Sequence, residues 1–379
     1  MYQLPCVCFV KSVSLRETAF ASFTRNFSLR ETAFASFAII TKNETSTMRI
    51  AIVRLSALGD IINSALILQF IKQAYPTARV EWICEEGFAP IIEAHPLLDA
   101  VHTVAIKRAK KTKSLPLLFH TISKLRSLGD FDKIIDLQGL LKSALVSRCI
   151  GKNIYGFDKN SIRESFASRF YRFYTHIAYD ENSIWRTLVL VSTALDIKIT
   201  KEMVETKKPA LFYKEEDNIT QDLLSTEKKN IAFVVGASWP SKIYPRENFI
   251  QLANKLDANI ILIWGSEAEK IEASHIAIAS FQTRLAPRLT LAQLTALIDS
   301  VDLVIGNDTG PTHIAWAMNK PSITLFGPTP ASKMMWQDET HIAIESDSKV
   351  DPLRLNRSDM SIKDISPLLV FEKARELLS

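Results

Sequence analysis

From Met48 onward, short apolar runs alternate with longer stretches in which apolar positions recur with a helical period. The apolar runs predict strands, and the amphipathic stretches predict helices. In the first half we expect strands at residues 49–55, 80–85, 101–106 and 133–138, and helices at residues 61–75, 114–128 and 140–150. Strands that alternate with helices in this way predict βαβ units and a parallel sheet.

The alternation breaks over residues 157–185, which are rich in Phe, Tyr and Arg, and then resumes. Further strands are expected at residues 230–237, 259–265, 302–308 and 322–327, and helices at residues 246–256, 267–279, 290–299, 311–318 and 367–378. The charged, weakly periodic stretch 204–228 favours a domain boundary near residue 205. The predicted fold class is α/β, with Rossmann-like domains at residues 48–205 and 206–379.

Ligands in open α/β sheets bind at the carboxyl ends of the strands, so the two domains are expected to face a central cleft. We expect a bilobal enzyme that binds two substrates, with the acceptor substrate on the first domain and the donor substrate on the second. Packing of the closing helix, residues 367–378, back onto the first domain is a further expectation.

Residues 1–47 have a different character, because SLRETAFASF occurs at residues 14–23 and again at 28–37. Two copies are too few for a solenoid, which needs several units to bury a core. We expect an extension outside the catalytic fold. An upstream start-site artefact and an amphipathic segment that touches a membrane are both compatible with this pattern.

The composition of the 379 residues narrows the class only modestly. A hydrophobic share of 47% is enough for a substantial core, and a net charge of +5 mildly favours anionic partners. Cys6, Cys8, Cys84 and Cys149 form no zinc set and suit a reducing cytosol. We find neither an apolar run long enough for a transmembrane helix nor a signal peptide.

The segment RLSALGD, residues 54–60, joins the first expected strand to the first helix. Gly59 permits an unusual turn, and Asp60 lies at the helix start. An Asp at this position can simply cap the helix. It can also act as a general base, because glycosyl transfer to a hydroxyl needs a group that takes the proton.

A second segment, GNDTGPTHIA at residues 306–315, follows a strand and opens a helix. Asp308, Thr309 and Gly310 lie at the turn, where free N–H groups can hold a phosphate, and His313 lies near the same face. Ordinary turn chemistry with a packed histidine is the alternative. The order of strand, turn and helix favours a diphosphate site.

Two other segments follow strands of the second domain. In GASWPSKIYP, residues 236–245, Ser238 and Lys242 are candidates for diphosphate contacts, although a lone lysine is usually only solvated. In WGSEAE, residues 264–269, either Glu267 or Glu269 can accept hydrogen bonds from a ribose. Negative charge in a first helical turn explains these glutamates equally well.

The run AIKRAKKTK, residues 105–113, places several cations at an expected strand end. Its basic residues are Lys107, Arg108, Lys110, Lys111 and Lys113, and Arg163 and Arg186 lie in the aromatic-rich stretch. A solvated charged surface and a site for an anionic acceptor both fit this run. The absence of G-x-G-x-x-G, G-x-x-x-x-G-K-[ST] and G-x-S-x-G disfavours dinucleotide oxidoreduction, P-loop chemistry and the α/β-hydrolase reaction.

Four blocks resemble the ADP-heptose glycosyltransferases, the lipopolysaccharide heptosyltransferases of glycosyltransferase family 9. They are RLSALGD at 54–60, DLQGLLKS at 136–143, NDTGPTH at 307–313 and FGPT at 326–329. The resemblance runs from Met48 to near the C-terminus, and it points to members that add the first heptose. It implies the GT-B fold.

The resemblance implies inverting transfer of L-glycero-D-manno-heptose from ADP-heptose to the first Kdo of Kdo2-lipid A. It further implies a peripheral cytoplasmic enzyme at the Gram-negative inner membrane, with neither an obligatory cofactor nor a nucleic-acid partner. Divalent metal stimulation stays open, and no metal ligand is predicted. Addition of the second or third heptose, and a non-catalytic nucleotide-sugar-binding module, are the alternatives.

The resemblance also assigns roles to residues. Asp60 matches the catalytic base. The donor-site matches are Ser238, Lys242, Glu269, with Glu267 as its alternative, Leu289 on the adenine, Asp308, Thr309, Gly310 and His313. The acceptor-site matches are Arg54, Lys107, Arg108, Lys111, Arg163 and Arg186.

Overall fold

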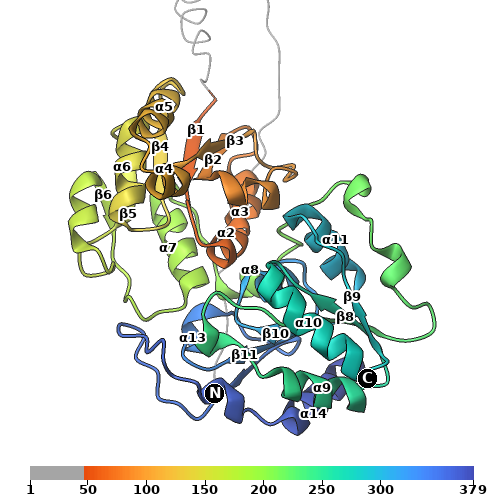
Figure 1. Cartoon of the computed structure of the whole chain (residues 1–379). Helices are drawn as coiled ribbons and strands as arrows, with labels where there is room; N and C mark the ends of the chain where they lie inside the picture. Colours follow the sequence, from red (N-terminus) through yellow and green to blue (C-terminus); the bar gives the residue numbers. More distant parts are fainter. Residues whose placement is uncertain (1–46) are drawn as a thin grey trace, which may run out of the picture. The chain divides into compact units, whose positions relative to one another are not determined.

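The computed structural model describes residues 47–379, which form one compact unit. The expected extension and its repeat, residues 1–46, lie outside the described residues. The described chain contains two sheets of six strands each, and every strand pairing in both is parallel (Figure 1). We call the part around each sheet the first and the second lobe.

The first sheet has the strand order β3-β2-β1-β4-β5-β6. Its strands are β1 (Arg49–Val53), β2 (Arg79–Glu85), β3 (Ala100–Val104), β4 (Lys133–Asp136), β5 (Ile154–Phe157) and β6 (Phe173–Thr175). The helices of this lobe are α2 (Leu58–Ala65), α3 (Ile67–Ala74), α4 (Ile106–Thr112), α5 (Leu115–Arg126), α6 (Leu141–Ile150) and α7 (Ser183–Leu195), with short 3-10 turns η1 (Glu86–Ile91) and η2 (Ser165–Phe170).

The second sheet repeats this topology in the order β12-β11-β10-β7-β8-β9. Its strands are β7 (Asn230–Val234), β8 (Asn259–Ile263), β9 (Thr283–Leu285), β10 (Leu303–Asn307), β11 (Ser322–Phe326) and β12 (His341–Glu345). Its helices are α9 (Arg246–Lys255), α10 (Glu267–Ala279), α11 (Leu291–Ser300), α12 (Gly310–Ala317), α13 (Ala331–Met334) and α14 (Pro367–Leu378), with η5 (Pro240–Lys242) and η6 (Ser361–Asp364).

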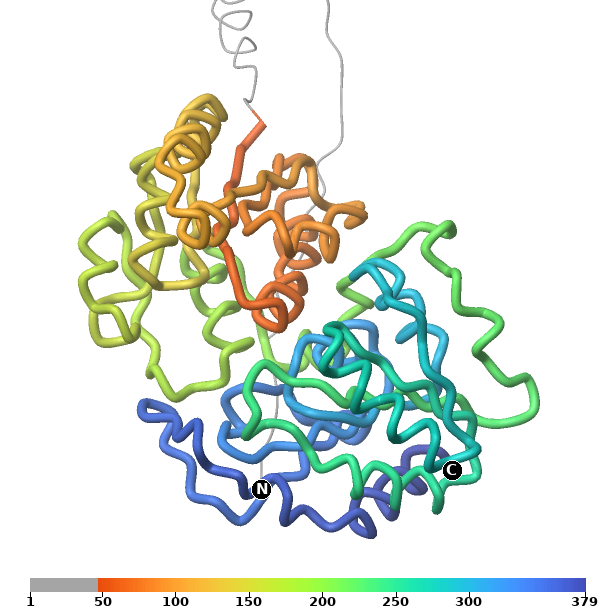
Figure 2. Tube along the Cα trace, viewed as in Figure 1, coloured from red at the N-terminus to blue at the C-terminus, as the bar shows by residue number. Residues whose placement is uncertain are grey.

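The segment between the lobes carries α8 (Lys201–Glu205), η3 (Glu215–Asp217) and η4 (Gln221–Leu223), and its course can be followed in Figure 2. In each sheet the strand order reverses between the first and the fourth strand. Such a switch point opens a crevice between the loops that follow the two strands, and ligands bind there. The loops after β1, β4, β7 and β10 are therefore the places to look for a site.

Several expected elements differ from the structure. The strands β5, β6, β9 and β12 were not predicted. They lie at or next to an edge of their sheet and are only partly buried, so their apolar pattern is weaker than that of the fully buried central strands. The expected helix 61–75 is two helices that meet at Leu66. The basic run 105–113 follows the end of β3, as expected, and most of it forms helix α4.

Helix α14 lies on α9 and the second sheet, which corrects the expectation that it packs on the first lobe. Its inward-facing Val370 and Ala374 belong to the apolar core of the second lobe, together with Phe249 of α9. The apolar positions of α14 therefore find their partners within their own lobe.

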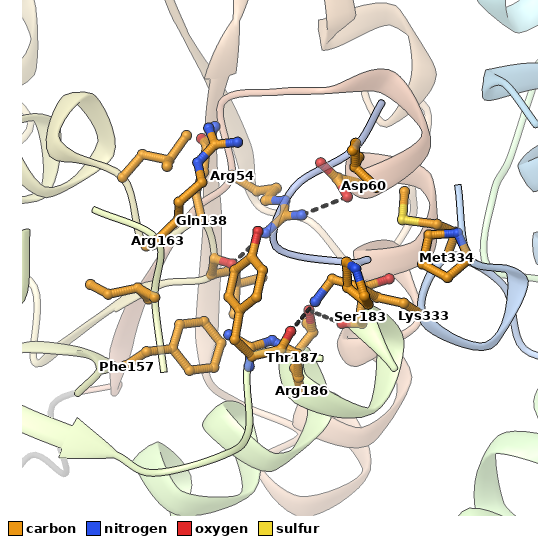
Figure 3. Close-up of a pocket in the computed structure, with 18 residues that line it drawn as sticks. Arg54, Asp60, Gln138, Phe157, Arg163, Ser183, Arg186, Thr187, Lys333 and Met334 are labelled. Carbon is orange, nitrogen blue, oxygen red and sulfur yellow. Dashed lines mark hydrogen bonds and ion pairs between the residues drawn. The ribbon is translucent and has the colours of Figure 1, made fainter. Parts of the chain in front are cut away.

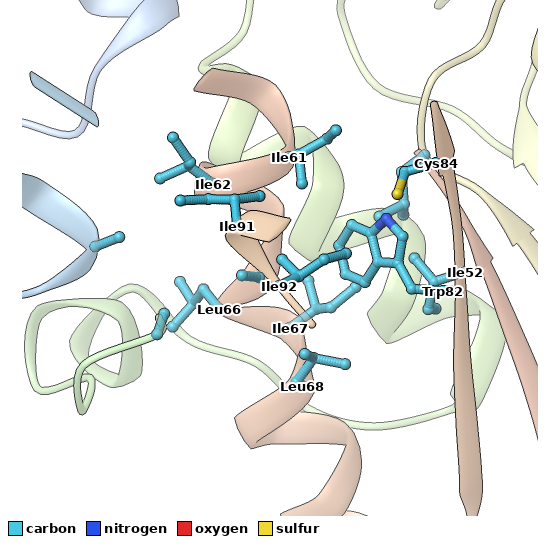
Figure 4. Packing of buried hydrophobic residues seen from close by; sticks show 14 of the residues in the cluster. Ile52, Ile61, Ile62, Leu66, Ile67, Leu68, Trp82, Cys84, Ile91 and Ile92 are labelled. Atoms are coloured by element: carbon cyan, nitrogen blue, oxygen red, sulfur yellow. The ribbon is translucent and has the colours of Figure 1, made fainter. Parts of the chain in front are cut away.

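The core of the first lobe fixes the loop after β1. Ile61, Ile62 and Ile67 of α2 and α3 lie in one buried cluster with Trp82 of β2 (Figure 4). The Trp82 side chain is fully buried, and its Nε1–H donates to the carbonyl of Arg54 at 3.4 Å. The buried Trp82 indole thus fixes the chain directly after β1.

Candidate active site

Asp60 lies in the first turn of α2, at the carboxyl end of β1. Its Oδ2 accepts a hydrogen bond from the Ala57 N–H at 3.1 Å, so it closes the helix start as a capping residue does. Its Oδ1 pairs with the Arg54 guanidinium at 2.8 Å. The side chain nevertheless keeps 33% of its surface exposed, which leaves it accessible to a substrate.

Arg54, predicted to hold an anionic acceptor, lines the cavity in front of Asp60, and its guanidinium faces Asp60. Nη2 contacts the carboxylate, and Nη1 donates to the Leu137 carbonyl after β4. Only 11% of the side chain is exposed. The geometry therefore supports a positioning role for Arg54, which ties the Asp60 carboxylate to the loop after β4.

A cavity of about 260 Å³ opens in front of Asp60 and has walls from both lobes (Figure 3). Gln138 and Arg163 come from the first lobe, and Lys333 and Met334 come from α13 of the second. The cavity is thus a cationic pocket with one accessible carboxylate at its edge.

Lys333 was missed by the sequence analysis. Its Nζ donates to the Tyr179 carbonyl and lies 3.9 Å from the centre of the Tyr179 ring. Burial, together with the nearby Arg186 charge, lowers the pKa of Lys333 to about 8. Because α13 carries no recognisable motif, only the fold brings this cation opposite Asp60.

Of the other residues predicted to bind the acceptor, some line this cavity and some do not. Arg163 lines the cavity and is exposed. Arg186 also lines it but is buried, and it donates to the carbonyls of Ser161, Ile177 and Ala178, so it mainly holds two loops together. Lys107, Arg108 and Lys111 are exposed on α4 and do not line the cavity.

The loop after β4 owes its shape to Asp136, a fully buried carboxylate. It accepts hydrogen bonds from the N–H groups of Gln138 and Gly139 and from the Tyr171 hydroxyl. Burial raises the pKa of Asp136. Gln138 in turn accepts from the Leu55 N–H at 2.9 Å, which fastens this loop to the one that carries Asp60.

The second lobe contributes a buried charge cluster after β7 and β10. Lys242 Nζ lies 2.5 Å from Asp308 Oδ2, and His313 Nε2 lies 3.3 Å from Asp308 Oδ1. The Thr329 hydroxyl donates to Asp308 at 2.8 Å. Burial opposes ionisation of Asp308, but Lys242 and His313 outweigh it and hold the pKa of this carboxyl well below its usual range.

A second cavity, of about 470 Å³, opens beside the start of α12 and is lined by Trp264, Glu269, Arg288, Leu289 and Thr309. Here the structure distinguishes the two glutamates: Glu269 lines the cavity, whereas Glu267 is 74% exposed elsewhere. Arg288 also lines this cavity, and the sequence analysis missed it because it belongs to no recognisable motif. Ser238 is exposed on the loop after β7 and does not line this cavity.

The two lobes touch where α2 meets α12. A Cβ on Gly59 would lie 2.5 Å from His313 Cδ2, and a Cβ on Gly310 would lie 2.4 Å from the end of the Leu58 side chain. Across the same seam, Asn63 Nδ2 lies 3.2 Å from His313 Nδ1. Asp60 is therefore one residue from a direct contact with the Asp308 cluster.

Replacing Gly59 by Ala is expected to lower kcat/KM by about 10²-fold, because a misplacement of about 1 Å at a site costs that much. The added methyl collides with the His313 ring, which must move away from Asp308. Steady-state kinetics measure the effect. Gly151→Ala is the matched control, since its Cβ would meet only the end of the Ile134 side chain and Gly151 lines neither cavity. Equal kinetics for both variants would contradict the assignment of the contact between α2 and α12 to the active site.

Among residues 47–379, no helix has the length and apolar character of a membrane span. In the same range, no three His, Cys, Asp or Glu side chains are arranged to hold a metal ion. Two Rossmann-like lobes, with the accessible Asp60 carboxylate on one and the Lys242–Asp308–His313 charge cluster on the other, are the arrangement of the GT-B class of glycosyltransferases.

Comparison with known proteins agrees with this class. A family model described as Glycosyltransferase family 9 (heptosyltransferase) matches residues 120–352. Lipopolysaccharide heptosyltransferase 1 of Campylobacter coli is 36% identical over 345 residues, covering 87% of this chain and 99% of that protein. The enzyme of the same name from Pseudomonas aeruginosa is 32% identical over 298 residues, covering 74% and 79%. This chain therefore belongs to glycosyltransferase family 9, the heptosyltransferases.

The solved structures give the same result for the fold. The E. coli heptosyltransferase WaaC with ADP-2-deoxy-2-fluoro heptose matches with a TM-score of 0.71 at 26% identity, covering 87% of this chain and 99% of that one. E. coli ADP-heptose lps heptosyltransferase II matches with a TM-score of 0.66 at 22% identity, covering 87% and 98%. The predicted family and the GT-B fold are confirmed.

Proposed function

We propose that this enzyme transfers L-glycero-D-manno-heptose from ADP-heptose to the first Kdo of Kdo2-lipid A, with inversion, in lipopolysaccharide core synthesis. The supporting observation is the seam between α2 and α12, where Asp60 of the first lobe lies beside the charge cluster of the second. The similarity to two proteins called lipopolysaccharide heptosyltransferase 1 favours the first heptose addition.

In the proposed reaction, Asp60 accepts the proton of the attacking acceptor hydroxyl, and the hydroxyl oxygen forms a bond to the anomeric carbon. The bond from that carbon to the ADP oxygen breaks on the opposite face, which inverts the configuration. Arg54 holds the carboxylate in place. An in-line displacement of this kind needs a base on one side and anion stabilisation on the other.

The donor is proposed to bind with its adenosine in the cavity of about 470 Å³. Leu289 packs on the adenine and Glu269 accepts from the ribose, while Gly310 offers its N–H group at the start of α12 to the diphosphate. Thr309, whose N–H already donates to Thr312 Oγ1 at 3.3 Å, faces the diphosphate with its side chain. Lys242 and Ser238 contact the diphosphate oxygens, and Asp308 and His313 face the sugar. ADP-heptose is accordingly expected to act as the donor substrate, and we expect no cofactor to be obligatory.

The acceptor is proposed to enter the cavity of about 260 Å³ with its carboxylates and phosphates facing Arg163 and Lys333. Lys107, Arg108 and Lys111 contact more distant anionic groups from α4. The first lobe is accordingly the acceptor domain and the second the donor domain. The enzyme is proposed to work as a peripheral protein at the cytoplasmic face of the inner membrane.

A mass-spectrometric assay of the purified protein tests this function. With ADP-heptose and Kdo2-lipid A we expect a product that carries one added heptose, and little transfer to an acceptor that already carries its first heptose. Transfer only to the heptosylated acceptor would assign a later step. Binding of ADP-heptose without transfer to either would identify a nucleotide-sugar-binding module instead. Parallel assays with EDTA and with added Mg²⁺ measure metal stimulation.

A further inference from the structure

Helix α5 has two apolar faces, although a helix on the surface of a lobe needs only one. Thr121 and Leu125 are buried and face the lobe. Leu115, Leu118 and Phe119 are 66%, 36% and 69% exposed, and the half-buried Ile122 follows them at helical spacing. Positions i, i+3, i+4 and i+7 share one side of a helix, so these four side chains form an outward apolar stripe.

The stripe continues onto the neighbouring elements. Helix α5 packs against α6, and α6 packs against η2. Leu141 and Leu145 of α6 and Phe166 of η2 are 38%, 46% and 56% exposed. We call the seven residues Leu115, Leu118, Phe119, Ile122, Leu141, Leu145 and Phe166 the α5–α6 face. Figure 1 places α5 and α6 together at one edge of the first lobe. Contiguous exposed apolar surface of this kind marks an interaction site.

Cations lie near the ends of α5 and α6, and one acid, Glu164, accepts a hydrogen bond from the Leu141 N–H at 2.8 Å beside the α5–α6 face. Lys110, Lys111 and Lys113 precede α5, Arg126 ends it, and Arg148 lies in the last turn of α6. None of these five cations forms an ion pair with another residue in the range 47–379. An apolar stripe with cations at both ends of the helix is typical of segments that lie in the interface of an anionic bilayer.

The second lobe offers a useful contrast. Ile271 and Ile278 of α10 are 56% and 82% exposed, so apolar exposure alone does not distinguish the two helices. Helix α10 carries Glu267, Glu269 and Glu272, which an anionic surface repels. Charge therefore selects the α5–α6 face as the partner of an anionic lipid surface.

The position of the α5–α6 face relative to the Asp60 cavity fits this partner. Leu140, which lines the cavity, directly precedes Leu141. Ile162 and Arg163 also line it and lead into η2. A lipid whose acyl chains remain in a bilayer beneath the face would thus have its polar head beside the cavity.

We propose that the α5–α6 face docks the enzyme on a bilayer that contains anionic lipids. The leucines and phenylalanines enter the boundary between headgroups and acyl chains, and the lysines and arginines contact the headgroup phosphates. This inference deepens the proposed function, because it identifies the surface through which a lipid-borne acceptor is reached.

Co-sedimentation of the full chain with vesicles of phosphatidylcholine, with or without phosphatidylglycerol, tests the docking. We expect binding only when phosphatidylglycerol is present. Two double variants are expected to bind these vesicles at least about tenfold more weakly: Leu115→Ser/Phe119→Ser and Lys110→Gln/Lys113→Gln. Ile271→Ser/Ile278→Ser is the matched control and should bind as the unmodified chain does. Equal binding to neutral vesicles, or unchanged binding of both variants, would overturn the proposal.

A second measurement separates docking from catalysis. Leu115→Ser/Phe119→Ser should lose transfer to Kdo2-lipid A in vesicles but retain transfer to a deacylated, water-soluble Kdo acceptor. If the unmodified chain transfers heptose to neither acceptor, the proposed function fails while the vesicle-binding result stands. Light scattering tests whether a second copy of the chain covers the α5–α6 face instead. If the unmodified chain is a dimer that Leu115→Ser/Phe119→Ser dissociates, the face is a dimer interface and lipid docking is refuted.

Discussion

Replacing Asp60 by Asn is expected to lower kcat by about 10²–10⁴-fold, the contribution of a positioned general base. Asn cannot accept the proton of the acceptor hydroxyl, but it preserves the size of the side chain. ADP-heptose binding should be unchanged, because the donor cavity is lined from η1, the tip of α2 and the second lobe without contact to Asp60. Kinetics with Kdo2-lipid A and calorimetric titration with ADP-heptose measure the two quantities.

The Asn variant is informative because it preserves the structural role of Asp60. The amide oxygen can still accept from the Ala57 N–H, so the start of α2 remains capped. The pair with Arg54 is partly exposed, and such pairs contribute only about 0–1 kcal/mol to stability. Asp130→Asn, an exposed carboxylate of the same lobe, serves as the matched control. Full activity of Asp60→Asn would remove the assignment of the base.

Replacing Lys242 by Ala is expected to have the second large effect, on catalysis and on stability together. Loss of an electrostatic contact to the leaving group costs roughly 10²–10³ in rate. The same substitution removes the closest ion-pair partner of Asp308, and breaking a buried pair costs about 3–5 kcal/mol. Steady-state kinetics and urea unfolding at neutral pH measure these two losses.

The pH dependence provides an independent check on Lys242→Ala. In the unmodified chain the pKa of Asp308 lies below its ordinary value of 3.8, so its stabilising contribution is present above that value and is lost only as pH falls through the lowered folded pKa. Without the ammonium, burial is opposed less and the folded pKa rises. The acid limb of the unfolding curve should therefore move to higher pH.

Lys229→Ala is the matched control for this pH experiment. Lys229 and Asp302 directly precede the neighbouring strands β7 and β10, with side chains 56% and 38% exposed and 3.7 Å apart. A surface pair of this kind contributes little, so the acid limb should stay in place. An unchanged acid limb for Lys242→Ala as well would show that Asp308 does not depend on Lys242.

The fold class, most of the strands and the loop positions of the chemistry follow from the sequence alone. The strand segments 50–53 and 303–306 contain no polar side chain because both faces of a parallel sheet are covered. The motif blocks at 54–60 and 307–313 follow these strands directly. A ligand site at the carboxyl ends of parallel strands therefore follows from local order along the chain.

Only the tertiary structure decides which charged residues meet. Lys333 lies across the cavity from Asp60, although 273 positions separate the two residues in the sequence. Its helix α13 carries no motif. Arg186 and the cations of α4 look alike in the sequence, yet one is buried among carbonyls and the others face solvent. Periodicity reports whether a side chain faces its own sheet, but it contains no information about the opposite lobe. The contact of Gly59 with His313, which joins the two halves of the site, comes from packing between lobes and not from any local pattern.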